Sequence, residues 1–153
     1  MTEFGCELSE GQIKSSEDNV TLIKEVEAGI DEEIEKVQLA GFPEEKINAR
    51  GQMTVWQRLR YLVDPGTWCP LHTLYNPADN PEGTTNVFDG LGKISGKWAV
   101  IIGFDNKLFA GAWIPGQADN VLRATDLSMR LNVPLVWLVN CSGVKLTEQE
   151  QFY

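Results

Sequence analysis

The sequence predicts an α/β protein in which two helices precede a small sheet. Two apolar segments, residues 87–94 and 98–104, are separated only by Ser95-Gly96, a pair suited to a two-residue hairpin turn. A helical pattern over residues 116–131 follows, and then an unbroken apolar run over residues 133–139. The order strand, strand, helix, strand is typical of an α/β structure with a parallel crossover, of which this chain would hold one incomplete turn.

The composition indicates a globular, water-soluble protein with one core. The chain has 153 residues, of which 42% are hydrophobic, and five tryptophans. No apolar run approaches the roughly 18–20 residues of a membrane span, and the acidic N-terminus does not resemble a signal peptide. Three widely spaced cysteines argue against a disulfide framework or a zinc site, so we expect a cytoplasmic protein.

The net charge of −9 is concentrated at the N-terminus. Residues 1–46 contain thirteen acidic residues and four lysines, whereas residues 47–153 contain nine acidic and nine basic residues. We therefore predict an acidic helical leader over residues 1–46 and a separate domain over residues 47–153. Nucleic-acid binding is not expected, because it needs a basic surface. The leader is either a solvated helix face or an acidic docking surface.

Helical spacing is clear in the first third of the chain. Residues 1–18 are expected to be loosely ordered, and a helix then runs from Val20 to the breakers Gly41 and Pro43. Its apolar positions recur at steps of three and four: Ile23, Val26, Ile30, Ile34 and Val37. A second helix is predicted over residues 53–63, with the capping box of Thr54 and Gln57 at its start.

The later elements are predicted from similar signals. Residues 68–85 are rich in Pro, Asn, Asp and Gly and are expected to be irregular, and His72 within them is assigned no chemistry. The helix over residues 116–131 should carry one face formed by Ala118, Val121, Leu122, Thr125 and Met129. The strand over residues 133–139 should be buried. A last helix should begin near Leu146, where a second capping-box pattern occurs.

The turn after the last strand, residues 140–144, is the main candidate site. Ser142 is a poor candidate nucleophile, because the only histidine lies in the irregular segment and no nucleophile elbow surrounds it. Cys141 is expected to be a small buried side chain. The N–H groups of Gly143 and Val144 can instead point at one spot beyond the strand end, where α/β sheets usually bind ligands. Such donors suit a thioester oxygen that becomes an enolate; a plain tight turn is the alternative.

From about Ala49 onward the chain resembles the N-terminal half of biotin-dependent carboxyltransferase subunits. Four stretches carry the resemblance: residues 50–67, which include Asp64-Pro65-Gly66, the hairpin at 89–97, Phe109-Ala110-Gly111-Ala112, and residues 140–145. The acyl-CoA carboxylase branch usually has Asp-Ser-Gly-Gly-Ala-Arg at the last stretch, where this chain has Asn-Cys-Ser-Gly-Val-Lys. The chain is more similar to the sodium-pumping decarboxylase branch of that family.

This resemblance implies a partial crotonase-like fold, a ββα spiral forming part of a carboxyltransferase N-domain preceded by two helices. It implies transfer of the carboxylate of glutaconyl-CoA to biotin on a separate carrier subunit, beside a membrane sodium-pump subunit, in a homodimer when full length. It also implies that two backbone N–H groups hold the oxygen of the CoA thioester. The turn at residues 142–144 would supply one of them, for which the Val144 N–H is favoured, with Gly143 beside it. Ser142 in the same turn would contact the substrate. The loop Lys107, Leu108, Phe109, Ala110 and Gly111 matches the wall of the CoA channel, where Lys107 can meet a phosphate.

Family members are several times longer, so the chain is expected to be an N-terminal fragment that is inactive alone. The second oxyanion donor and the biotin site are expected beyond residue 153. Two other interpretations stay open at this stage. One is the carboxyltransferase β subunit of an acyl-CoA carboxylase of the propionyl- or methylcrotonyl-CoA type. The other is a non-catalytic docking fragment that binds a partner through the acidic helix.

Overall fold

The computed structural model describes residues 7–81 and 83–151. Its elements, in chain order, are α1 (Glu10–Leu39), α2 (Glu44–Asn48), α3 (Val55–Leu62), β1 (Cys69–Leu71), β2 (Val87–Ile94), β3 (Lys97–Phe104), the 3₁₀ turn η1 (Phe109–Gly111), α4 (Gln117–Leu131), β4 (Leu135–Leu138) and η2 (Leu146–Gln151). The chain divides into two compact units between Glu35 and Lys36. The predicted domain boundary at residue 46 stays a prediction. Among the described residues, no helix is both long enough and apolar enough to cross a bilayer.

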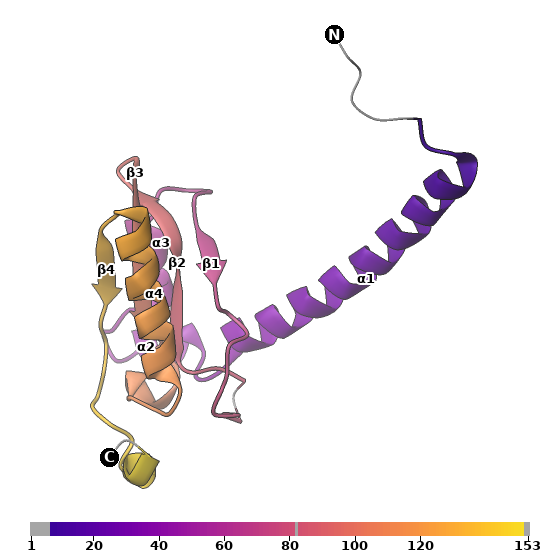
Figure 1. Cartoon of the computed structure of the whole chain (residues 1–153). Helices are drawn as coiled ribbons and strands as arrows, with labels where there is room; N and C mark the ends of the chain where they lie inside the picture. Colours follow the sequence, from indigo (N-terminus) through magenta and orange to yellow (C-terminus); the bar gives the residue numbers. More distant parts are fainter. Residues whose placement is uncertain (1–6, 82, 152–153) are drawn as a thin grey trace. The chain divides into compact units, whose positions relative to one another are not determined.

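The second unit is built on a four-stranded sheet in the order β1-β2-β3-β4 (Figure 1). Strands β2 and β3 form the predicted antiparallel hairpin, and both turn residues, Ser95 and Gly96, have positive φ as a type I′ turn requires. Strand β4 pairs with β3 in parallel, and α4 makes the crossover between them. The predicted α/β order is therefore confirmed, with the additional short strand β1 inside the segment expected to be irregular.

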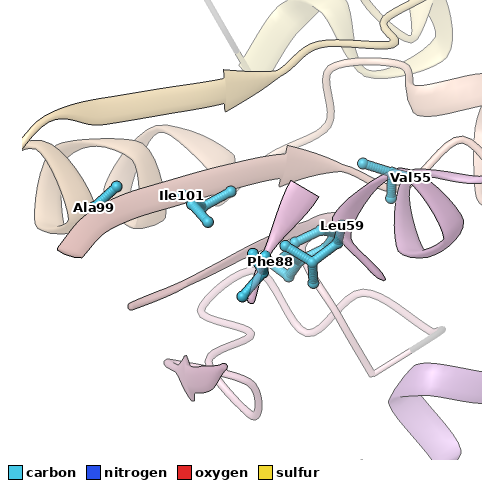
Figure 2. Packing of buried hydrophobic residues seen from close by; sticks show 6 residues of the cluster. Val55, Leu59, Phe88, Ala99 and Ile101 are labelled. Atoms are coloured by element: carbon cyan, nitrogen blue, oxygen red, sulfur yellow. The ribbon is translucent and has the colours of Figure 1, made fainter. Parts of the chain in front are cut away.

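The sheet carries one helix on each face. Alternate side chains of β2 and β3 point to opposite faces because the side-chain period of a strand is two residues. Toward α3 they form a core of Val55, Leu59, Val63, Phe88, Ala99 and Ile101, five of which Figure 2 labels. Toward α4 they form a second core of Val87, Val100, Ile102, Phe104 and Ala124. This two-sided burial explains why Val100, Ile101 and Ile102 are all fully buried in one run.

Two expectations about exposure are corrected. Strand β4 is an edge strand, with Trp137 43% exposed, because no other described strand pairs with its outer edge. Helix α4 turns only part of the predicted apolar face outward: Leu122 and Met129 are exposed, whereas Val121 packs against the core on the α4 side. Its buried residues are instead Gln117, Asn120, Ala124 and Ser128. Three of these four are polar, and their side chains hydrogen-bond to backbone or hydroxyl oxygens, which a search for apolar periodicity cannot detect.

The N-terminal helices also differ in extent from the prediction. Helix α1 begins at Glu10, so residues 10–18 are helical rather than loose, while residues 1–6 lie outside the described part. It ends at Leu39, just before the predicted breakers. Helix α2 was missed because it is only five residues long. Helix α3 begins behind Thr54 with the predicted capping box intact. The segment that begins at Leu146 is a 3₁₀ turn rather than an α-helix.

Candidate active site

The turn that follows β4 is held by a single strand-like bridge to the loop before α4. Val144 and Trp113 form a parallel β-bridge. The Trp113 N–H donates to the Gly143 carbonyl at 2.7 Å, and the Lys145 N–H donates to the Trp113 carbonyl at 3.0 Å. Gly143 has φ +112°, a conformation that side chains rarely adopt. The turn is therefore ordered by backbone hydrogen bonds on both sides of Val144.

These hydrogen bonds leave the amide of Val144 unused. In a parallel bridge the flanking residues supply the donor and the acceptor, so the N–H of the bridged residue faces the opposite side. Among the described residues, no acceptor receives the Val144 N–H, and this residue is 41% exposed. The Gly143 N–H instead lies 3.4 Å from Sγ of Cys141, a weak acceptor. The Val144 N–H thus has no acceptor among the described residues, and the Gly143 N–H is partly engaged by a weak acceptor.

The structure brings the two predicted site segments together although they are about thirty residues apart in the chain. The Ser142 hydroxyl donates to the Phe109 carbonyl at 3.3 Å. The ammonium of Lys145 lies 4.3 Å from the centroid of the Phe109 ring. Phe109 and Ala110 are exposed, whereas Gly111 is buried against the turn. The predicted oxyanion turn and part of the predicted channel loop consequently form one surface.

The first two residues of the predicted channel loop do not reach that surface. Lys107 is 6% exposed, and its ammonium donates to the Gln38 carbonyl at 2.5 Å. Leu108 is 4% exposed. The expectation that Lys107 meets a phosphate is therefore corrected, because its charge is directed to the end of α1. Of the lysines in the two segments, Lys145 is the one beside the turn.

Asp105, at the end of β3, anchors the start of the loop. Its carboxylate accepts a hydrogen bond from the Trp56 indole N–H at 2.9 Å and another from the Lys107 N–H at 2.9 Å. Burial raises the pKa of Asp105 above its ordinary value, and these hydrogen bonds oppose the rise only in part. The contacts tie the loop to α3, so we assign Asp105 a structural role.

The structure shows no nucleophile paired with a base among the side chains considered for nucleophilic catalysis in the described part of the chain. His72 lies 2.9 Å from the Asp89 carboxylate, through its Nδ1, and so is a structural partner of β2 rather than a base for Ser142. Cys141 is exposed, which corrects the expectation of a buried side chain. Its exposure follows from its place in an edge turn beyond β4.

Sequence reasoning missed Trp113, and it placed Asn140 in the candidate turn without predicting its contact with Gly111. The backbone of Trp113 forms the β-bridge with Val144. The centroid of its ring lies 5.7 Å from the centroid of the Phe104 ring. The Asn140 carbonyl lies directly against Gly111. The only sequence signal for Trp113 was indirect, because it is an apolar residue in a polar, glycine-rich stretch. A backbone contact between two loops leaves no pattern in the chain.

The arrangement is suited to holding a partially negative oxygen atom. An unpaired N–H at a strand end stabilises charge that develops on a carbonyl oxygen without any proton transfer by a side chain. Among the described residues, no group of three His, Cys, Asp or Glu side chains is placed to hold a metal ion.

Comparison with curated proteins points to one group of enzymes. The chain is 46% identical over 140 residues to glutaconyl-CoA decarboxylase subunit alpha of Acidaminococcus fermentans, covering 92% of this chain and 24% of that protein. It is 27% identical over 150 residues to the mitochondrial methylcrotonoyl-CoA carboxylase beta chain of Dictyostelium discoideum, covering 89% and 24%. It is 28% identical over 123 residues to methylmalonyl-CoA decarboxylase subunit alpha of Propionigenium modestum, covering 74% and 24%. The chain thus spans about a quarter of the length of these curated relatives.

Solved structures agree on the fold. Transcarboxylase 12S superposes with a TM-score of 0.69 at 16% identity, covering 95% of this chain and 28% of that one. The beta subunit of geranyl-CoA carboxylase from P. aeruginosa superposes with a TM-score of 0.60 at 22% identity, covering 84% and 24%. These neighbours are crotonase-fold carboxyltransferases, which confirms the predicted fold. The sequence model of the carboxyl transferase domain matches residues 46–153, more than half of the chain, and the chain therefore belongs to the carboxyl transferase domain family.

Proposed function

We propose that the chain is the N-terminal part of the carboxyltransferase subunit of a biotin-dependent, sodium-translocating decarboxylase, and that its substrate is glutaconyl-CoA. One observation carries the choice of substrate: the identity of 46% to the glutaconyl-CoA enzyme, against 27% to a methylcrotonoyl-CoA carboxylase over a similar length. A gap of this size favours a common reaction with the first relative. The rival, a β subunit of a propionyl- or methylcrotonyl-CoA carboxylase, has the weaker support.

The Val144 N–H is the group that this chain contributes to the chemistry. When the carbon–carbon bond to the departing carboxylate breaks, its electron pair delocalises toward the thioester oxygen, which gains negative charge. A preorganised amide donor stabilises that charge most in the transition state, and losing one such donor typically costs about 3–4 kcal/mol of barrier height. The Gly143 N–H lies next to it, and Phe109, Ala110 and Gly111 form the adjacent wall for the CoA thioester.

The remaining parts of the reaction belong to other components. Biotin, on a separate carrier subunit, supplies the nitrogen that accepts the carboxyl group. No described residue is assigned to biotin, and we propose that its site and the second oxyanion donor lie in the rest of the subunit. A membrane decarboxylase subunit would couple carbon dioxide release to sodium export, and the complete subunit would form a homodimer. The fragment alone would be inactive.

The test is the substitution Val144→Pro in the complete subunit, with Val144→Ala as its control. Proline removes the N–H, and neither bridge hydrogen bond uses an atom of Val144, because they join Trp113 to Gly143 and Lys145. We expect the rate of glutaconyl-CoA decarboxylation with free biotin to fall about 100-fold or more, with binding of CoA retained. Val144→Ala keeps the amide and should keep the rate. Unchanged turnover in the proline variant would remove Val144 from the mechanism.

A docking role for the acidic leader is the second candidate, and it is favoured by the surface of α1. The helix has no buried residue, and its apolar stripe is open, with Ile23 56%, Val26 62% and Ile30 45% exposed. Acidic residues flank this stripe. An exposed apolar stripe on a charged helix is typical of a surface that binds another polypeptide. The partner that we propose is the biotin carrier or the membrane subunit.

A further inference from the structure

The loop before α4 and the turn after β4 are fitted to each other at the position of Gly111. Gly111 has φ +73°, and a methyl group placed on it would lie 1.7 Å from the Asn140 carbonyl oxygen. Side-chain carbon atoms essentially never approach an oxygen within 3.0 Å, so any other residue would displace the turn or the loop. The glycine allows the loop to lie directly against the residue that begins the turn.

The loop is also held in an uncommon backbone conformation. Phe109 and Ala110 have φ values of +48° and +53°, followed by Gly111 at +73°. Non-glycine residues in this region carry backbone strain, and such strain persists only where surrounding contacts maintain it. The contacts here come from the turn itself, through Ser142 and Lys145 on Phe109.

Two residues further along, the loop determines the direction of the turn's backbone. The bridge between Trp113 and Val144 orients the peptide groups on both sides of Val144. The Trp113 ring, 5.7 Å from Phe104, fixes this part of the loop to the core on the α4 side. The direction of the Val144 N–H is thus linked through the bridge to the packed sheet.

We propose that the loop 109–113 is a template that aims the Val144 N–H, and that Gly111 and Trp113 are positioning residues of the oxyanion site. The inference rests on the proposed function of Val144. In this proposal Gly111 positions the turn that carries Val144, which is a different role from lining the CoA channel. Gly111 permits the close approach, and Trp113 transmits the rigidity of the core to the turn.

The experiment compares Gly111→Ala with Gly66→Ala in the complete subunit. Gly66 also has φ +73°, but nothing lies within 4 Å of a methyl group placed on it, so it reproduces the backbone strain without the collision. We expect Gly111→Ala to lower kcat for glutaconyl-CoA about 100-fold, as for the loss of one oxyanion donor, while the Kd for CoA stays within about threefold. Gly66→Ala should retain the wild-type kcat. Equal kcat in the two alanine variants would overturn the template.

A second variant covers the case in which Gly111→Ala does not fold. Trp113→Leu keeps the backbone bridge and removes the contact of the ring with Phe104. We expect a loss of about tenfold or more in kcat with CoA binding retained, because the turn is then less rigid. A wild-type kcat in Trp113→Leu would likewise overturn the proposal.

Val144→Pro separates this inference from the proposed function. If Val144→Pro abolishes turnover but Gly111→Ala and Trp113→Leu do not lower it, the template fails and the oxyanion donor stands. If Val144→Pro has full activity, the oxyanion role fails, and a reduced kcat in Gly111→Ala would then reflect another use of the loop, which overturns the template as stated.

Discussion

Asp89 illustrates how a single buried residue limits the stability of this domain. It lies on β2 with 1% of its surface exposed, and its Oδ2 lies 2.9 Å from Nδ1 of His72. Burial raises the pKa of Asp89 above its ordinary value, while the contact with His72 and the charge of Arg123 oppose that rise. Its other oxygen, Oδ1, is buried without a hydrogen-bond donor among the described residues. A charged carboxylate is therefore costly at this position.

The replacement Asp89→Asn should show this cost as a pH dependence. Because the folded pKa lies above the unfolded value, the native state binds the proton more tightly. The stability from this group is present below the unfolded pKa and is lost as the pH rises through the folded pKa. We expect the free energy of unfolding of Asp89→Asn, relative to the wild type, to increase between pH 3.5 and pH 7, as measured by urea unfolding at each pH. Asp126→Asn, at an exposed site, should show a smaller change.

At the scale of one element, α3 shows which local signals are sufficient. Its capping box was predicted from two residues, and both reciprocal hydrogen bonds are present: Gln57 N–H to the Thr54 hydroxyl at 3.1 Å and Thr54 N–H to the Gln57 side chain at 2.8 Å. Tertiary contacts complete the cap, because Asn106 accepts from the Val55 N–H at 2.9 Å. The same pattern at Thr147 gave only a 3₁₀ turn, so the motif alone does not determine the kind of helix.

Thr54→Ala should therefore destabilise the domain by about 1–2 kcal/mol, because the buried threonine caps the helix and its hydroxyl also donates to Glu44 at 3.0 Å. Equilibrium unfolding in urea measures this loss. Thr147→Ala, at an exposed position, is the matched control and should change stability by less than about 0.5 kcal/mol. A similar loss of stability in both variants would show that the cap of α3 contributes no more to the free energy of unfolding than an exposed threonine does.

At the scale of the whole molecule, the chain has two distinct parts: the acidic N-terminal unit that ends at Glu35, and the unit from Lys36 onward that contains the sheet, called the sheet domain below. The compact units divide after Glu35, and residues just beyond this point serve the sheet domain, since the Gln38 carbonyl accepts from Lys107 and Glu44 pairs with Arg60 at 3.0 Å. A deletion that tests the leader should therefore stop at residue 35. The family match, which begins at residue 46, is consistent with a leader that lies outside the carboxyl transferase domain.

Removal of residues 1–35 from the complete subunit should abolish binding to the carrier or membrane subunit and leave transfer to free biotin unchanged. The apolar stripe of α1 is the reason, so replacing Ile23, Val26 and Ile30 by serine should have the same effect while keeping the helix charge. Co-purification of the complex measures binding. Retained complex formation in both variants would contradict the docking role, and lost transfer would instead place the leader in the catalytic fold.

The sequence alone determined the order of the main elements, the hairpin, the cap of α3 and the family, because these depend on neighbouring residues or on contiguous motifs. A strand end followed by a glycine turn is also a local pattern, and from it the sequence predicts a site at Ser142, Gly143 and Val144, which stays a prediction. Only the tertiary structure decided that the Lys107 side chain is buried, that β4 is an edge strand, and that Trp113 bridges Val144. These facts depend on contacts between segments far apart in the chain, and the bridge consists of main-chain atoms that every residue type shares.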